Sequence, residues 1–231
     1  MRARTLLVVM ASSVLVISTA AMAGASVVAV PTTPCAQPDG RVSAMAVSSG
    51  TVYIGGSFTH VMDRSGVSRP RTRLAAINTA TCDLLPWTAD AGNSVTALAV
   101  THGTVYVGGS FLTKNGLPRA RIAALDGASA TLLPFNPGVN NTVSALLASG
   151  TSLYAGGSFT NVAGVTRGKL AAFTLSSGAL DQSWTPGANA AVTTLALGTD
   201  GADAHVAGHS SSLHGKRPRS VWAPGPASAG C

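Results

Sequence analysis

Val52-Tyr53-Ile54-Gly55-Gly56-Ser57-Phe58 is the stretch that decides the fold, because the chain repeats it. It returns at residues 105–111 as Val-Tyr-Val-Gly-Gly-Ser-Phe and at residues 153–159 as Leu-Tyr-Ala-Gly-Gly-Ser-Phe. A fainter copy, His-Val-Ala-Gly-His-Ser, occupies residues 205–210. Tandem units of this kind bury their apolar faces only by stacking on their neighbours. The sequence therefore predicts an array of similar supersecondary units.

The second copy predicts four short strands in each repeat. Residues 95–100 and 104–111 form a predicted hairpin around Thr101-His102-Gly103, and Asn115-Gly116 marks the next turn. Residues 122–126 and 131–135 are the third and fourth predicted strands. Four short strands per repeat are typical of a β-propeller blade. The rival fold is a right-handed solenoid, whose coils are shorter, roughly 20–30 residues in leucine-rich repeats.

Repeat spacing sets the expected domain organisation. After an N-terminal segment, residues 24–41, we expect blades over residues 42–94, 95–142, 143–191 and 192–231. In the last of these, Ala207 replaces the first glycine, and Pro224 and Pro226 fall where a third strand is expected. Proline cannot donate to a central ladder. The prediction is an all-β, propeller-type array of about four four-stranded blades, the last degenerate or incomplete.

Three outcomes are open for the ends of this array. Residues 26–30 (Ser-Val-Val-Ala-Val) are a candidate for a missing outer strand, which would close a four-bladed ring. Alternatively, the blades form an open arc that oligomerises through its uncovered edges. The third alternative is a non-functional fragment of a longer surface protein. The prolines of the last repeat favour the open arc or the fragment.

The first 23 residues predict an export signal. Arg2 and Arg4 precede an apolar stretch over residues 6–17, and Ala21-Met22-Ala23 provides a small-residue cleavage site. An uncleaved membrane anchor is the alternative, but polar residues and glycine dilute the stretch that would have to span the bilayer. We therefore expect a secreted or cell-surface protein with no transmembrane segment after signal removal.

Three cysteines leave at least one thiol unpaired within the chain. Cys35 and Cys82 are the candidate disulfide, worth on the order of 4 kcal/mol by loop-closure entropy. In the usual blade order these residues belong to loops on opposite faces. The bridge therefore requires the N-terminal segment to lie along the blade edge as an added outer strand. Two unpaired thiols are the alternative.

The composition is basic, with 15 Lys and Arg against 8 acids and a formal net charge of +7. This excess favours anionic partners. Nucleic acid is not expected, because its recognition needs basic runs with stacking aromatics. The aromatics recur instead eight residues before the next repeat, at Trp87, Phe135 and Trp184, as expected of apolar fillers between blades. The paired glycines predict a close backbone approach or a bulge.

Three motifs carry a family resemblance: Val-Tyr-Val-Gly-Gly-Ser-Phe, then Gly-x-x-Arg-x-x-Leu-Ala-Ala, then Trp-x-Pro. Together they resemble the secreted bacterial β-propellers built from delta-sixty-type repeats, a family without a settled activity. They are also similar to the propeller region of fungal cortical polarity-marker proteins. The resemblance covers residues 42 to about 200. It implies an exported or surface-bound propeller and supplies no catalytic residues.

Cations recur at the start of the predicted third strand, and a second cation follows two residues later in the first three copies. The candidate binding residues are Arg71, Arg119, Arg167 and Arg219, with Arg73, Arg121 and Lys169. Loops between second and third strands reach one face of a propeller, so we expect a basic arc there. It would dock an anionic cell-wall polymer or polysaccharide, or a surface protein. Alternatively, each arginine satisfies backbone carbonyls, as is usual for a residue required in every repeat.

No catalytic residue, cofactor or metal site is expected. The sequence has no nucleophile elbow, Cys-x-x-Cys pair, or phosphate- or calcium-binding loop. His205, His209 and His214 lack the cysteine or carboxylate partners of a metal site. The predicted function is a non-enzymatic binding or scaffold module at the cell exterior. The enzyme alternative is a glycan hydrolase or lyase that uses turn-borne acids such as Asp126 and Asp181.

Overall fold

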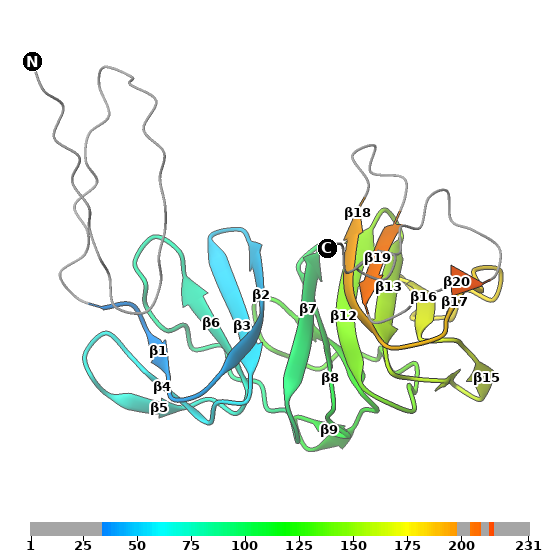
Figure 1. Ribbon diagram of the computed structural model, residues 1–231. Coiled ribbons are helices and arrows are strands. Elements are labelled where there is room, and N and C mark those ends of the chain that lie inside the picture. The colour runs from blue at the N-terminus through cyan, green and yellow to red at the C-terminus, as the bar shows by residue number, and fades with distance from the viewer. Residues whose placement is uncertain (1–33, 198–203, 209–212, 215–231) are drawn as a thin grey trace, which may run out of the picture. The chain divides into compact units, whose positions relative to one another are not determined.

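The structure, a computed structural model, describes residues 34–197, 204–208 and 213–214, and its regular elements there are all β-strands (Figure 1). The chain divides into two compact units, residues 1–32 and 33–231. The predicted export signal, Arg219, the C-terminal prolines and Cys231 lie outside the described residues. In the described part, no helix has the length and hydropathy to cross a bilayer.

Three consecutive antiparallel sheets form three blades, and each has its second strand in the middle. Their strands are β2 (Val42–Ser48), β3 (Thr51–Gly56) and β6 (Leu74–Asn78) in blade 1; β7 (Val95–Thr101), β8 (Thr104–Gly109) and β11 (Ile122–Asp126) in blade 2; and β12 (Val143–Ser149), β13 (Ser152–Gly157) and β16 (Leu170–Thr174) in blade 3. In blade 4, β18 (Val192–Leu197) pairs with β19 (Ala204–Gly208). The predicted all-β, propeller-type array with a degenerate last blade is confirmed.

In blades 1 to 3 the fourth strand is reduced to a single bridge. Leu84, Leu132 and Leu180 bridge to Ile77, Leu125 and Phe173, respectively. The prediction of a full strand over residues 131–135 is therefore wrong. In blade 2 the N–H of Leu133 still donates to the carbonyl of Ala124 at 2.9 Å, but Pro134 follows and has no N–H to continue the ladder.

Small hairpins connect the second and third strands and define one end of the blades, named here the hairpin face (Figure 1). At Asn115-Gly116 both φ angles are positive, 49° and 75°, which is the geometry of a tight hairpin turn and confirms the turn predicted there. The hairpins are β4 (His60–Met62) with β5 (Ser68–Pro70), β9 (Thr113–Lys114) with β10 (Leu117–Pro118), and β14 (Asn161–Val162) with β15 (Val165–Thr166). Two further short antiparallel pairs join strands that are distant in sequence: β1 (Gln37–Pro38) pairs with β4, and β17 (Gly187–Ala188) pairs with β20 (Leu213–His214).

Neighbouring blades interlock glycines with branched side chains. A Cβ added to Gly108 would lie 2.7 Å from Cγ1 of Val143 in the next blade. Gly55 and Gly156 face Val95 and Val192 in the same way. The second glycine of each pair leaves room for the backbone of its own blade, because a Cβ on Gly109 would strike the carbonyl oxygen of Ser94. The close approach predicted from the paired glycines is confirmed.

The recurring aromatic residues pack inside the array, as predicted. Trp87 is 3% exposed and packs edge to face against Tyr53, with ring centroids 5.3 Å apart. The corresponding pairs are Phe135 with Tyr106 at 5.3 Å and Trp184 with Tyr154 at 5.2 Å. Such edge-to-face pairs add about 0.5–1.5 kcal/mol beyond the buried area alone.

A disulfide joins Cys35 to Cys82, with Cα atoms 4.6 Å apart. The N–H of Ala36 donates to the carbonyl of Cys82 at 3.2 Å, and Ala36 packs into the core of blade 1. The described part of the N-terminal segment, residues 34–41, therefore lies along the edge of blade 1, which is the condition that the pairing required. The bridge spans 47 residues of sequence, so its loop-closure stabilisation is on the order of 4 kcal/mol.

Candidate functional site

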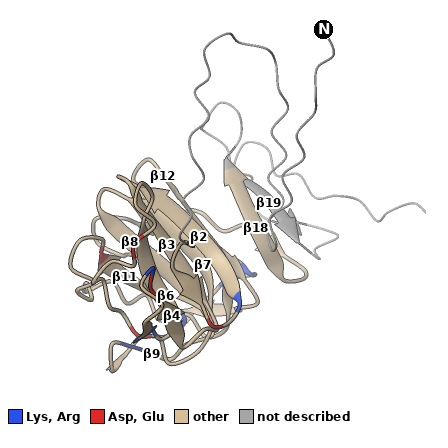
Figure 2. Ribbon diagram, turned by 90° about the vertical axis from the view of Figure 1, so that its left-hand side faces the viewer, with Lys and Arg blue, Asp and Glu red and all other residues tan. Residues whose placement is uncertain are grey.

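Most of the positive charge lies at one end of the described blades. The exception is Arg64, whose guanidinium donates to the carbonyl of Thr81 at 2.6 Å and pairs with Asp83 at 3.3 Å, in the turn that follows β6 at the other end. Each described Lys or Arg lies between the second and third strands of a blade or, in the case of Arg41, directly before its first strand. Figure 2 shows most of these residues toward the end of the blades where β4 and β9 lie. The shared face expected for the recurrent cations is therefore present, with Arg219 outside the described residues.

Three of the predicted binding arginines are held by backbone carbonyls. Each guanidinium donates to the carbonyl of the preceding residue and to a second carbonyl 14 residues later, where the chain leaves the blade. The pairs are Arg71 with Pro70 (2.9 Å) and Leu85 (2.9 Å), Arg119 with Pro118 (2.8 Å) and Leu133 (3.3 Å), and Arg167 with Thr166 (3.0 Å) and Asp181 (3.2 Å). This geometry favours the structural alternative for these three residues, because each one clamps a hairpin to its blade.

The second cation of each repeat has a left-handed backbone. Arg73, Arg121 and Lys169 have φ angles of 67°, 69° and 69°. Arg73 and Arg121 also donate to carbonyls, those of Ala91 at 2.7 Å and Ser110 at 2.5 Å. The ammonium of Lys169 has no hydrogen bond or ion pair with any described residue. Among the described members of the predicted set, Lys169 is therefore the one that is available to a ligand.

Arg41 is a cation that sequence reasoning missed. It is exposed, and its guanidinium has no partner in the described part of the chain. The residues at the same position of the next two repeats are Ser94 and Thr142, so a cation does not recur there. In the sequence, Arg41 could have been recognised as a cation directly before the first strand, which places it at the end of the blade where the hairpins lie.

Lys114 is fully buried, although the other blades hold Val61 and Val162 at the same position of the hairpin. Its ammonium donates to the carbonyl of Asp90 at 2.7 Å and to Oδ1 of Asn115 at 3.0 Å. Burial lowers the pKa of Lys114 to about 7, and the charge of Asp90 offsets only part of this effect. An amine of this kind is nucleophilic at neutral pH, but here it is sealed from solvent.

Asp126 and Asp181, the acids of the enzyme alternative, accept hydrogen bonds within their own backbone turns. Oδ1 of Asp126 accepts from the N–H of Ala128 at 3.0 Å and from the N–H and hydroxyl of Ser129, both at 2.7 Å. Oδ1 of Asp181 accepts from the N–H and hydroxyl of Ser183 at 2.8 and 2.6 Å. The serine hydroxyl is the main cause that lowers the pKa of each carboxyl. Neither is poised as a general acid, a role that requires a raised pKa.

Metal binding is not supported by the described residues. Among them, no group of three His, Cys, Asp or Glu side chains could hold a metal ion. His205 lies in β19 and His214 in β20, and His209 is outside the described residues.

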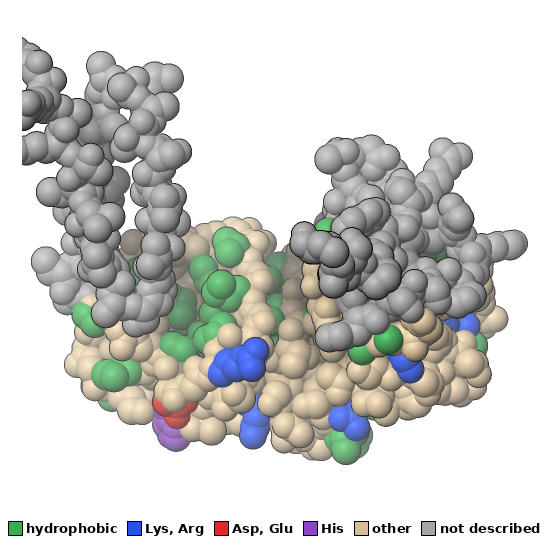
Figure 3. Space-filling model, in the orientation of Figure 1, with side chains coloured by type: hydrophobic (Ala, Val, Ile, Leu, Met, Phe, Trp, Pro, Cys, Tyr) green, Lys and Arg blue, Asp and Glu red, His purple; other side chains and the backbone are tan. Residues whose placement is uncertain are grey.

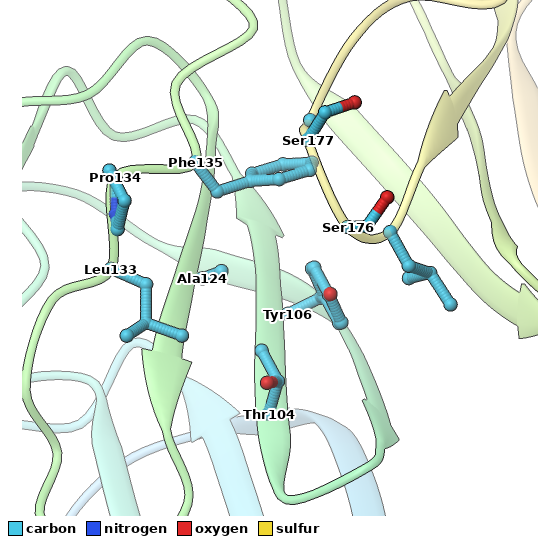
Figure 4. A pocket seen from close by; sticks show the side chains of 10 residues that line it. Thr104, Tyr106, Ala124, Leu133, Pro134, Phe135, Ser176 and Ser177 are labelled. Carbon is cyan, nitrogen blue, oxygen red and sulfur yellow. The ribbon is translucent and has the colours of Figure 1, made fainter.

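A hydroxyl-rich pocket of about 170 Å³ lies between blades 2 and 3, at the opposite end from the hairpins. Figure 4 shows Tyr106 and Phe135 on one side and Ser176 and Ser177 on the facing loop. An adjoining pocket of about 340 Å³ shares Tyr106 and Ser176 and adds further hydroxyl groups and His102. A ring face beside several hydroxyls can hold a small uncharged hydroxylated ligand.

No protein-family model and no curated protein sequence matches the chain. Solved structures that match include the computationally designed Ika4 protein, with 16% identity over 76% of this chain and 90% of that chain and a TM-score of 0.51. Saccharomyces cerevisiae Sqt1 matches with 16% identity over 66% and 38% of the two chains and a TM-score of 0.45. The extracellular domain of a putative one-component system from B. thetaiotaomicron matches with 16% identity over 77% and 23% and a TM-score of 0.43. The likeness to Ika4 agrees with the propeller-type array and concerns the fold alone.

Proposed function

We propose that the chain is an exported, non-enzymatic propeller-type module that docks an anionic partner on its hairpin face. The observation that carries the proposal is the segregation of charge, since the described Lys and Arg residues other than Arg64 lie at that end of the blades. Cations gathered on one face attract a polyanion and orient its approach. The partner class is an anionic cell-wall polymer or polysaccharide.

The cations of the hairpin face fall into two groups, those that stabilise the hairpins and those that are available to bind a ligand. Arg71, Arg119 and Arg167 hold the hairpins in place through carbonyls and keep the face rigid. Arg41 and Lys169 have no partner among the described residues, so their charges are available to a ligand. A contact made by such accessible charges is modest per residue and weakens with salt.

Export and the lack of catalysis have separate support. The Cys35–Cys82 disulfide fits an oxidising compartment, and it agrees with the export signal predicted over residues 1–23. The carboxyls of Asp126 and Asp181 are used by their own turns, so neither of the acids named in the glycan hydrolase alternative is set up as a general acid.

The test compares two double variants that change the net charge equally, by two units. Arg41→Gln with Lys169→Gln removes charge from the hairpin face, whereas Ser49→Asp with Ala128→Asp adds acids to turns at the other end of the blades. Affinity for polygalacturonate is measured by titration at low and moderate salt. We expect roughly fivefold weaker binding for the first variant and less than twofold for the second. Equal weakening in both would show that net charge alone matters and would refute the proposal.

Arg119→Gln provides the structural comparison in the same experiment. Loss of its two carbonyl contacts is expected to cost about 1–3 kcal/mol of unfolding free energy. Binding per folded molecule should change little, because the guanidinium is already engaged. If Arg119→Gln instead kept its stability but lost binding, Arg119 would contact the ligand rather than stabilise the fold.

A further inference from the structure

Blade 1 has an uncovered apolar face. In each blade, the side that faces the preceding blade is named here the upstream face. Leu98 in β7 and Leu146 in β12 lie on upstream faces and are each 9% exposed. At the matching position of β2, Met45 is 69% exposed. Val47 is 67% exposed, whereas its counterparts Val100 and Ala148 are half-buried. Figure 3 shows apolar side chains gathered over the region of β2 and β3.

The covered junctions show what kind of surface fits an upstream face. Val95 and Leu98 rest against Gly55 of blade 1, and the same cluster includes Ala44 and Ala46. The first strand of blade 2 thus lies on a surface of small residues presented by the blade before it. On blade 1, Ala36 joins the cluster of Ile54 and Ala75, but it leaves Met45 and Val47 uncovered.

The first strand of blade 4 carries small residues at the positions that face the next blade. By register, Thr194 and Ala196 match Ala97 and Ala99 of β7. Thr194 and Ala196 in β18 are exposed, although the matching Ala97 and Ala99 in β7 are buried. Neither β2 nor β18 contains a charged residue.

We propose that a second copy of this chain covers blade 1, with the far face of its blade 4 packed head to tail on Met45 and Val47. The contact repeats the packing of the three internal junctions. Two copies supply eight blades, within the usual range of about 4–8 for propellers, whereas three would supply about twelve. The dimer is therefore closed by two identical junctions. It is independent of the hairpin face, so either proposal can fail alone.

The test uses sedimentation of the purified full chain at micromolar concentration. The unchanged protein should sediment as a dimer. Met45→Glu and Ala196→Glu should each give folded monomers whose melting temperature no longer depends on protein concentration, because each change breaks both junctions. A mixture of the two variants should recover a heterodimer, since one junction then joins two unaltered faces. Leu112→Glu is the matched control, because Leu112 is 60% exposed on the hairpin side and should not affect association.

Two outcomes overturn the proposal. A monomeric unchanged chain would mean that residues of the same molecule cover the face or that it stays open. A dimer that is lost in Met45→Glu but kept in Ala196→Glu would mean that two blade 1 faces meet each other.

Discussion

Replacing Gly109 by alanine is expected to cost at least about 3 kcal/mol of unfolding free energy, the upper end of ordinary overpacking. The added Cβ would strike the carbonyl oxygen of Ser94 and lie 3.1 Å from Cα of Val95. Both atoms belong to the backbone at the start of the blade, so no side chain can rotate away. Gly56 and Gly157 face the carbonyls of Arg41 and Thr142 in the same way.

Gly103→Ala is the matched control for this prediction. Gly103 has a φ of 72° and no neighbouring atom within 4 Å of an added Cβ, so only backbone strain is introduced. That strain is worth about 1 kcal/mol. Urea unfolding of both variants measures the difference. Equal losses would show that the contact with Ser94 is not the reason for glycine at position 109.

Lys114→Met is expected to remove a pH dependence of stability. Burial lowers the pKa of Lys114 to about 7 in the folded chain, against 10.5 for an unperturbed lysine. Between these two pKa values the unfolded chain binds more protons than the folded chain. The free energy of unfolding therefore rises as the pH increases from about 7 to 10.5. Below pH 7 Lys114 is protonated in both states and adds no pH dependence. Methionine fills a similar volume without an ionisable group and should flatten the rise.

Urea midpoints measured from pH 6 to 10 test this prediction. Lys169→Met is the control, because it removes a lysine that has no partner among the described residues. The control should keep the slope of the unchanged chain. Retention of the same slope in Lys114→Met would show that Lys114 ionises normally in the folded protein.

The blade cores could be predicted from the sequence because their determinants recur. Residues 122–126 were predicted as a strand and form β11 with the same bounds. The first strand, predicted over residues 95–100, extends only one residue further, to Thr101. Alternating small and branched residues, with glycines at fixed offsets, define these strands locally. The fourth strand was overpredicted. In blades 1 and 2 a proline follows two leucines and ends the ladder there, because it has no N–H to donate.

The candidate site was harder to predict, because its determinants depend on three-dimensional contacts. Recurrence located the arginines, but it could not show that Arg71, Arg119 and Arg167 would be occupied by carbonyls 14 residues away. Lys114 broke the repeat pattern and was detectable as a lysine in place of valine. The uncovered face of blade 1 could not be read from the sequence, because the pattern of β2 matches that of covered strands.

The interlocking of neighbouring blades is the central claim, and a double-mutant cycle on Gly108 and Val143 tests it most directly. A Cβ at position 108 would lie 2.7 Å from Cγ1 of Val143, so Gly108→Ala should destabilise the chain strongly on its own. Val143→Ala removes that methyl group and makes room. We predict that the double variant loses at least about 1 kcal/mol less than the sum of the two single losses. Losses that add within about 0.5 kcal/mol would contradict the packing of one blade against the next.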